Sequence, residues 1–296
     1  MMPANNLVLT QSIPTLSIQD LEGKAKRLRA TCVQMAHDGR EGHLNGALSC
    51  MDLLVALFNG WLEINPDEPK QDSRDRFIFS KGHACTAYYA VLAEQKFFPT
   101  EWLTQYAQNN SPLPSHPCLH ALPVLEWSSG SLGHGLGVAT GMSYGLRLKK
   151  SHSRVVALLS DGECNEGSTW EGAMFAAAQQ LENLLVVVDY NRIQSVGRTD
   201  ELNGFTSFEE KFKAFGWGAN TIDGHNFVEI IDALDKFPFE SGKPSALIAK
   251  TTAGRGVSFM EDQVLWHYRV PSRDDVQQAL DELGEAPIYA REEVSL

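Results

Sequence analysis

Two polar side chains with metal-ligand chemistry stand directly after two apolar runs of this sequence. Asp161 follows "VVALLS" and Asn191 follows "LLVVVDY". About thirty residues separate them, the length of one strand–helix–strand unit, and neighbouring parallel strands lie about 4.8 Å apart. A carboxylate and an amide oxygen at adjacent strand ends can share one hard cation such as Mg²⁺, which keeps places for water and a diphosphate. The spacing therefore indicates a candidate site for a metal and an anion.

Other loop chemistries fit "DGECNE", residues 161–166, less well. An acidic loop after a strand can simply cap the next helix, because Asp and Asn accept hydrogen bonds from free N–H groups, and this interpretation stays open. A calcium loop needs Glu at its twelfth position, which is Gly172 here. A P-loop needs G-K-[ST] and a dinucleotide fingerprint needs G-x-G-x-x-G, and neither follows the strand. The helix that begins near Gly167 would direct its positive end towards an anion.

The elements that must position these residues alternate between apolar strands and helices. We expect strands at 155–160, 184–190, 218–223 and 245–250, and helices near 167–181, 207–216 and 226–237. Such alternation is typical of an α/β fold in which a parallel sheet carries helices on both faces. Ligands of these sheets bind outside the carboxyl ends of the strands, where Asp161 and Asn191 stand.

The amino-terminal half is predicted to contain a helix, a second apolar helix, a strand and another helix. These cover residues 18–38, 47–62, 77–80 and 84–96. Residues 109–131 are rich in Pro, Ser and His and indicate a long irregular segment of the kind that is often functional. We predict a single domain over residues 1–296, with a loose arm at 1–17 and a tail at 272–296 that begins as a helix.

Composition narrows the class of protein. The 296 residues carry a net charge of −12, which argues against binding to nucleic acid or to an anionic membrane. The sequence has no signal-peptide pattern and no run of about 18 apolar residues, so no membrane segment is expected. The five cysteines include no C-x-x-C pair, so reduced thiols and a cytoplasmic location are expected.

The residues around both strand ends resemble a known family. "SDG…DYN" is similar to the thiamine diphosphate motif, and "DGECNEGSTWEGAMFAA" with "NRIQ" resembles the transketolase family, in particular the N-terminal subunit of transketolases that are split into two chains. The resemblance implies a thiamine diphosphate-binding fold. It also implies that Asp161, Asn191 and the carbonyl of Ile193 bind Mg²⁺, or Ca²⁺ or Mn²⁺, and that Gly162 and Asn191 contact the cofactor. Ser160 stands where the family motif has Gly.

Four of the nine histidines match positions of the same family, in segments that resemble it. "EGHLNGALS" and "RFIFSKGHA" imply that His43 lies near the substrate and His83 on the diphosphate. "SHPCLHALPVLEWSSGSLGHG" implies that His116 lies near the terminal hydroxyl of the donor, and "KTTAGRGVSFMEDQVLWH" places His267 near diphosphate and substrate. The glycine-rich part of the third segment implies three further cofactor contacts, from Gly130, Ser131 and Leu132.

By this resemblance the chain is the N-terminal subunit of a thiamine diphosphate-dependent transketolase. Such an enzyme transfers a two-carbon ketol unit from a ketose or ketose phosphate donor to an aldose-type acceptor, and His43, His116 and His267 would act on sugar hydroxyls. The glutamate that protonates the cofactor belongs to a pyrimidine-binding domain, for which a chain ending at Leu296 has no room. A separate C-terminal pyrimidine-domain subunit is therefore expected, in an α2β2 heterotetramer, with Glu166 meeting the catalytic glutamate across the interface.

Two other functions remain open from the sequence. The α-subunit of a 2-oxo acid dehydrogenase, or of an acyloin-type enzyme, shares the cofactor motif and the two-chain layout, although the histidine pattern favours transketolase. The other alternative is a non-catalytic interaction subunit that kept the fold. Two residues depart from the family: His134 stands where many members have Gln, and Tyr268 stands where Gly is usual, so that a phenol would narrow the substrate entrance.

Overall fold

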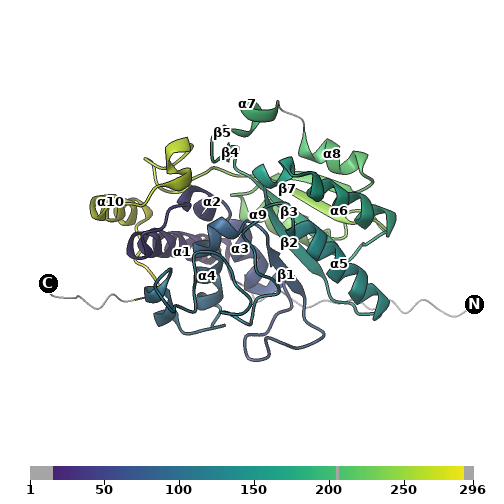
Figure 1. The fold of residues 1–296 in the computed structure, drawn as a ribbon, viewed down its shortest axis with the longest axis horizontal. Helices are drawn as coiled ribbons and strands as arrows, with labels where there is room; N and C mark the ends of the chain where they lie inside the picture. Colours follow the sequence, from purple (N-terminus) through teal and green to yellow (C-terminus); the bar gives the residue numbers. More distant parts are fainter. Residues whose placement is uncertain (1–15, 205–206, 290–296) are drawn as a thin grey trace, which may run out of the picture.

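The computed structural model describes residues 16–204 and 207–289. At its centre is a sheet of five parallel strands with helices on both faces (Figure 1). The predicted α/β class with a parallel sheet is confirmed. The strands lie in the spatial order β1-β2-β3-β7-β6. Their bounds are β1 Arg76–Phe79, β2 Val155–Ser160, β3 Leu184–Tyr190, β6 Gly218–Asp223 and β7 Ser245–Lys250.

The apolar runs form the middle strands because both of their faces are covered. Every residue of β2 and β3 is buried, as expected for parallel strands between two helical layers. The register pairs Val155 with Leu184 and Ser160 with Asp189. Asp161 and the end of β3 therefore leave the sheet at the same edge, on neighbouring strands.

Alternate strand residues build two separate cores, as the two-residue period of a strand requires. On one face, residues such as Val156 and Val187 pack against mainly amino-terminal helices (Figure 1). These are α1 Ile18–Gly39, α2 Leu44–Ser49, α3 Met51–Ala56, α4 Cys85–Glu94 and α9 Phe227–Asp235. On the other face, Ala157 and Val186 pack against a second group of helices. These are α5 Gly135–Leu148, α6 Gly167–Ala178 and α8 Phe208–Ala214.

The prediction of one helix over residues 47–62 is wrong. The structure has α2 and α3, which are separated at Cys50 and followed by a π-helical turn, Leu57–Trp61. At the break, Arg29 of α1 donates a hydrogen bond from Nε to the Leu48 carbonyl at 3.0 Å. The break thus coincides with a contact from a residue about twenty positions away, which a local apolar pattern cannot reveal.

The irregular segment predicted at 109–131 is confirmed, because it contains no helix or strand. Its Glu126 carboxylate forms ion pairs with Arg76, the first residue of β1, and with Arg74 just before it, which tie the segment to the sheet. Helix α5 follows at Gly135 and was not predicted, because glycines interrupt its apolar pattern.

Short elements border the carboxyl edge of the sheet. They are the hairpin of β4 Ile193–Gln194 with β5 Gly197–Arg198, and helix α7 Thr199–Asn203. Short 3-10 helices occur at Gly82–Ala84, Thr100–Gln105, Gly162–Asn165 and Val264–Tyr268. The hairpin and α7 therefore extend beyond the carboxyl ends of the strands.

The carboxyl-terminal part returns to the first helical layer. Helix α10, Arg273–Leu283, begins with a capping box at Ser272 and buries Val276 and Ala279 in the core that contains α1. The predicted helix in the tail is confirmed. Residues 290–296, and most of the arm predicted at 1–17, lie outside the described residues. Within residues 16–204 and 207–289, no helix combines the length and apolar character that crossing a membrane requires.

Candidate active site

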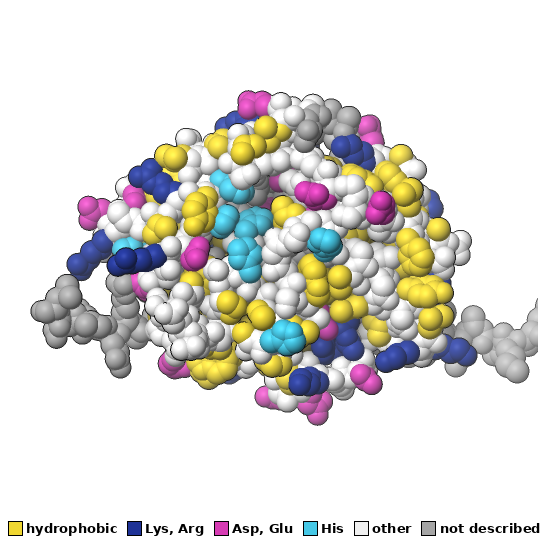
Figure 2. All heavy atoms as spheres, in the orientation of Figure 1, with side chains coloured by type: hydrophobic (Ala, Val, Ile, Leu, Met, Phe, Trp, Pro, Cys, Tyr) yellow, Lys and Arg dark blue, Asp and Glu magenta, His cyan; other side chains and the backbone are white. Residues whose placement is uncertain are grey.

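A cavity of about 430 Å³ opens at the carboxyl ends of β2 and β3. Figure 2 shows histidine side chains gathered beside a hollow on this face of the molecule. Most of the predicted site residues line the cavity: His43, His83, His116, Gly130, Leu132, Asp161, Gly162, Glu166, Asn191, Ile193 and His267. Ser131 does not line it, and its side chain is exposed. The fold therefore brings together segments that are far apart in the sequence.

The ends of β2 and β3 are in contact through the Asp161 carboxylate. Its Oδ2 accepts hydrogen bonds from the backbone N–H of Arg192 at 2.9 Å and from Thr199 Oγ1 at 2.6 Å. Its Oδ1 accepts the Gly162 N–H at 2.9 Å. Arg192 directly follows Asn191, so the carboxylate of one strand reaches the backbone beside the amide of the other. The two strand ends are thus as close as the sequence spacing predicts.

The Asp161 carboxylate and the Asn191 amide oxygen, at these strand ends, suit a hard divalent cation. Asp161 is 1% exposed and Asn191 is 6% exposed. The three hydrogen bonds to Asp161 come from neutral donors, and burial raises the pKa of this carboxyl to about 6. A bound cation would offset the buried charge, and a site with oxygen ligands alone suits Mg²⁺, Ca²⁺ or Mn²⁺.

A buried ion pair lies beneath the cavity, and the sequence analysis missed it. The Lys81 ammonium and the Asp189 carboxylate are fully buried and paired, and Lys81 Nζ also donates to the Gly46 carbonyl at 2.9 Å. Burial lowers the pKa of Lys81, but the charge and hydrogen bond of Asp189, together with smaller contributions from Cys50 and Asp161, outweigh burial and hold this pKa above its ordinary value. The available signal was a charged residue inside the apolar run "LLVVVDY", two positions before Asn191.

The glycine-rich turn at residues 130–135 is shaped by close packing. Gly133 has φ +86°, and its N–H donates to Glu163 Oε1 at 2.9 Å. Its carbonyl accepts a hydrogen bond from Ser168 Oγ at 2.8 Å. A Cβ at Gly133 would lie 2.6 Å from Glu166 Cβ and from Ser168 Oγ. Only glycine fits, because both the backbone conformation and the space exclude a side chain.

Three histidine rings form a close group in the cavity wall. The ring centroids of His43, His83 and His267 lie 5.5, 5.7 and 5.9 Å apart. Burial lowers the pKa of His43 and of His267 to about 4, and it lowers the pKa of His83 well below its ordinary value. The Lys81 charge adds to the lowering at His267 and His83. The three imidazoles are therefore neutral near pH 7, the form that both accepts and donates hydrogen bonds.

His43 has an unusual backbone conformation at the start of α2. Its φ of 59° and ψ of 33° lie in the left-handed region, which non-glycine residues rarely adopt. The Tyr268 ring packs edge-on against His43 with a centroid distance of 4.5 Å. Beside them, a Cβ at Gly42 would lie 2.8 Å from the Arg269 nitrogen. Tyr268 thus braces His43, while His134 precedes α5 and does not line the cavity.

The family comparison decides the identity of this site. The chain matches the family "Transketolase, thiamine diphosphate binding domain" over residues 22–294. The chain belongs to the transketolase family. It is 38% identical over 269 residues to a subunit of apulose-4-phosphate transketolase from Actinobacillus succinogenes, covering 90% of this chain and 97% of that protein. It is 36% identical over 248 residues to "6-deoxy-6-sulfo-D-fructose transketolase subunit SqwG" of a Clostridium species, covering 84% of this chain and 90% of that protein.

A solved structure shows the same relationship. Transketolase from Campylobacter jejuni matches with a TM-score of 0.86 and 28% identity, over 93% of this chain and 44% of that chain. The chain therefore spans less than half of that transketolase but nearly all of the subunit from Actinobacillus succinogenes. These comparisons confirm the predicted fold and identify an N-terminal, thiamine diphosphate-binding transketolase subunit.

Further residues of this transketolase subunit line the cavity and were missed by sequence reasoning. They are Gly46, Asn165, Gln194 and Ser195. Asn165 Nδ2 donates to Gln194 Oε1 at 3.0 Å, which joins the loop after β2 to the hairpin after β3. A Cβ at Gly46 would lie 3.4 Å from His83 Nε2. Each lies within four positions of a predicted site residue, which was the available signal.

Proposed function

We propose that this chain is the N-terminal subunit of a split transketolase, which transfers a two-carbon ketol unit from a ketose or ketose phosphate to an aldose-type acceptor. The observation that carries this proposal is the set of residues that line one cavity. It combines an oxygen set, at Asp161, Asn191 and Ile193, with four histidines from other segments. The family match favours this function over a role in a 2-oxo acid dehydrogenase and over a non-catalytic role.

The metal is proposed to be Mg²⁺, or Ca²⁺ or Mn²⁺, held by the side chains of Asp161 and Asn191 and by the Ile193 carbonyl. No group of three or more His, Cys, Asp or Glu side chains in the described part of the chain could hold a metal. A site here therefore depends on amide and backbone oxygens beside one carboxylate, which leaves places for a diphosphate. His83 and Gly162 are proposed to contact the cofactor from the walls. So are Gly130, Ser131 and Leu132.

Thiamine diphosphate, when bound, supplies the carbon nucleophile that the transfer of a ketol unit requires. The chain supplies neutral imidazoles around the substrate. His43 and His267 are neutral at pH 7, because burial lowers their pKa values to about 4, so each ring can accept one hydrogen bond from a sugar hydroxyl and donate another. His116 is proposed to hold the terminal hydroxyl of the donor, and Glu166, exposed before α6, to meet the catalytic glutamate of the partner.

A pyrimidine-domain subunit is proposed to complete the site, in an α2β2 assembly. Two of the relatives that match most of this chain are themselves named as subunits of transketolases. Exposed apolar side chains stand beside lining residues, with Val196 next to Ser195 and Leu265 near His267, so a partner surface could cover them. Among the described residues no lysine or arginine lines the cavity. A basic group for a sugar phosphate would therefore come from the partner.

A cytoplasmic location is also proposed, from the state of the cysteines. All five are free thiols in the structure, and four of them are buried. Burial raises the pKa of Cys32 and Cys164, which makes these thiols unreactive. Unpaired cysteines without a partner for a disulfide are typical of a reducing compartment.

The test combines the full chain with a pyrimidine-domain subunit, thiamine diphosphate and Mg²⁺. Ketol transfer is measured from hydroxypyruvate or a ketose phosphate, and pyruvate with an artificial electron acceptor is assayed in parallel. We expect ketol transfer only when both subunits are present. Robust turnover by this chain alone would refute the split site, and pyruvate oxidation would favour the dehydrogenase. Failure of the assembly to bind thiamine diphosphate would leave only a non-catalytic role.

A further inference from the structure

The amide of Asn191 is oriented by a buried carboxylate behind it. Asp189 of β3 is fully buried. It accepts hydrogen bonds from Ser49 Oγ at 2.6 Å, Asn191 Nδ2 at 3.4 Å, Lys81 Nζ and Thr251 Oγ1. Asn191 Nδ2 also donates to Ser49 Oγ at 3.1 Å. Both bonds hold the amide nitrogen. The amide oxygen Oδ1 accepts the N–H of Ile193 at 3.0 Å, and its second lone pair is left to serve as a ligand.

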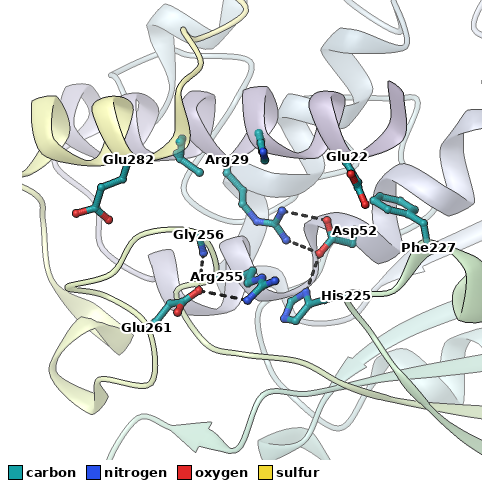
Figure 3. A pocket seen from close by; sticks show the side chains of 11 residues that line it. Glu22, Arg29, Asp52, His225, Phe227, Arg255, Gly256, Glu261 and Glu282 are labelled. Carbon is teal, nitrogen blue, oxygen red and sulfur yellow. Dashed lines mark hydrogen bonds and ion pairs between the residues drawn. The ribbon is translucent and has the colours of Figure 1, made fainter. Parts of the chain in front are cut away.

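A second cluster of polar side chains consists of Arg29, Asp52 and His225 (Figure 3). Arg29 of α1 and His225, after β6, are both directed at Asp52 of α3. The guanidinium makes two bonds to the carboxylate, at 3.0 and 2.6 Å, and His225 Nδ1 lies 2.7 Å from Asp52 Oδ2. On the other side of the ring, Nε2 accepts the N–H of Thr252 at 2.8 Å. Since an amide N–H only donates, Nδ1 carries the ring proton and donates it to Asp52.

The hydrogen bonds around Asp189 and those around Asp52 reach two consecutive residues of one loop, Thr251 and Thr252. The N–H of Thr252 is bound by His225, and the hydroxyl of Thr251 is bound by Asp189. Gly224, which precedes His225, packs so closely that a Cβ would lie 2.5 Å from Thr251 Cγ2. If the loop moved away from Asp189, the fully buried Oδ1 of this carboxylate would lose its hydrogen bond, and a shift away from His225 would break the bond to the Thr252 N–H.

We propose that His225 is a positioning residue for the metal ligand Asn191, acting through the peptide 251–252 and the Asp189 carboxylate. The inference rests on the proposed metal site. The Asp52 carboxylate fixes the ring so that Nε2 remains an acceptor directed at the loop. His225 does not line the catalytic cavity and instead lines a separate surface pocket of about 280 Å³. It therefore acts through other residues and does not touch substrate or cofactor. Groups that hydrogen-bond to a metal ligand, as Asp189 does to Asn191, orient the ligand in many sites, and His225 supports this partner through the loop.

Two substitutions of His225 separate its two hydrogen bonds. Gln places a carbonyl oxygen near the position of Nε2 and can still accept the Thr252 N–H. Asn places an amide nitrogen near Nδ1 and keeps only the bond to Asp52. Thr251→Ser and Thr251→Val form a second pair, which keeps or removes the hydroxyl that binds Asp189. All four variants leave the residues that line the cavity unchanged.

The measurement is the Mn²⁺ affinity of the full chain with thiamine diphosphate and its partner subunit, followed by the electron paramagnetic resonance of free Mn²⁺. We expect His225→Asn and Thr251→Val to weaken Mn²⁺ binding about 10-fold, as loss of an outer-shell partner does. We expect His225→Gln and Thr251→Ser to stay within about twofold of the wild type, because each keeps the bond that matters. Thermal unfolding of each variant is recorded beside the affinity.

Each outcome decides between explanations. Unchanged Mn²⁺ affinity in either His225→Asn or Thr251→Val overturns the positioning role, whatever happens to their unfolding temperatures, because the proposed route needs both residues. If that result comes with lost affinity in Asp161→Asn, the metal site itself still stands. If the wild-type assembly binds no Mn²⁺ with thiamine diphosphate, the proposed function fails and the positioning role fails with it. Should His225→Asn not fold, unchanged Mn²⁺ affinity in Thr251→Val overturns the positioning role, because the proposed route runs through the Thr251 hydroxyl.

Discussion

Asp161→Asn should have opposite effects on stability and on cofactor binding. The carboxylate is 1% exposed, and its hydrogen bonds come from neutral donors. Without a cation the fold therefore holds a buried charge, and with a cation that charge becomes a ligand. The amide keeps the shape and removes the charge. We expect a more stable metal-free chain that has lost Mg²⁺-dependent binding of thiamine diphosphate.

The size of the stability change follows from the pKa. Burial raises the pKa of Asp161 from 3.8 to about 6. Because the folded-state pKa exceeds the unfolded one, ionisation destabilises the fold, with no cost below about pH 4 and the full cost above about pH 6. A difference of about 2 pKa units corresponds to about 3 kcal/mol. The amide nitrogen would face the Gly162 N–H, which costs about 1–2 kcal/mol. The net gain at pH 7 is then about 1–2 kcal/mol, or about 2–6 °C in Tm.

Two assays check this prediction. Thermal unfolding in a chelator, at pH 7 and near pH 4, should show the gain at the higher pH and its disappearance at the lower. Titration of thiamine diphosphate with Mg²⁺, in the presence of the partner subunit, should show loss of binding. Asp200→Asn is the control, because Asp200 is exposed and the change in net charge is the same. A lower Tm in the metal-free variant would refute the burial argument, and unchanged Mg²⁺-dependent binding would refute the ligand assignment.

Three further predictions concern the cavity walls. His43 and His267 should titrate in nuclear magnetic resonance with midpoints near pH 4, and their contribution to stability should fall as the pH drops from about 6.5 to 4; a midpoint near 6.5 would contradict this. Gly133→Ala should lower the free energy of unfolding by about 2 kcal/mol or more, because the Cβ has no room. Gly141→Ala, in open space on α5, should raise it by about 0.5–1 kcal/mol. Equal effects of the two substitutions in thermal unfolding would refute the packing argument. His116→Ala should reduce kcat/KM for ketol transfer by about 10²–10⁴-fold while thiamine diphosphate affinity is retained, and a loss confined to cofactor affinity would assign His116 to the cofactor.

Much of the sheet was predictable because its middle strands are buried on both faces. Strands β2 and β3 begin with five consecutive apolar residues each, at 155–159 and 184–188, and polar residues follow, so local pattern alone locates them. The break at Cys50 was not predictable, because it coincides with an arginine contact from α1. Helix α5 was missed for a different reason, since its glycines weaken a helical pattern that tertiary packing nevertheless stabilises.

The residues that line the candidate site were predictable, whereas the residues that hold them in place through hydrogen bonds were not. The spacing of Asp161 and Asn191 indicated adjacent strand ends, and the register between β2 and β3 places them so. The histidines came from resemblance alone, because no local rule joins four residues in four distant segments. Asp189 and His225 were missed, because hydrogen bonds between distant elements determine their roles, and a single sequence does not record such contacts.

The central claim is that Asp161, Asn191 and the Ile193 carbonyl hold one divalent cation against the diphosphate. Crystals of this chain with its partner subunit, grown with thiamine diphosphate and Mn²⁺, would locate the metal by anomalous scattering. We predict a single manganese peak within coordination distance of these three oxygens and of the diphosphate. A bound cofactor with no such peak, or with manganese bound by other residues, would contradict the account.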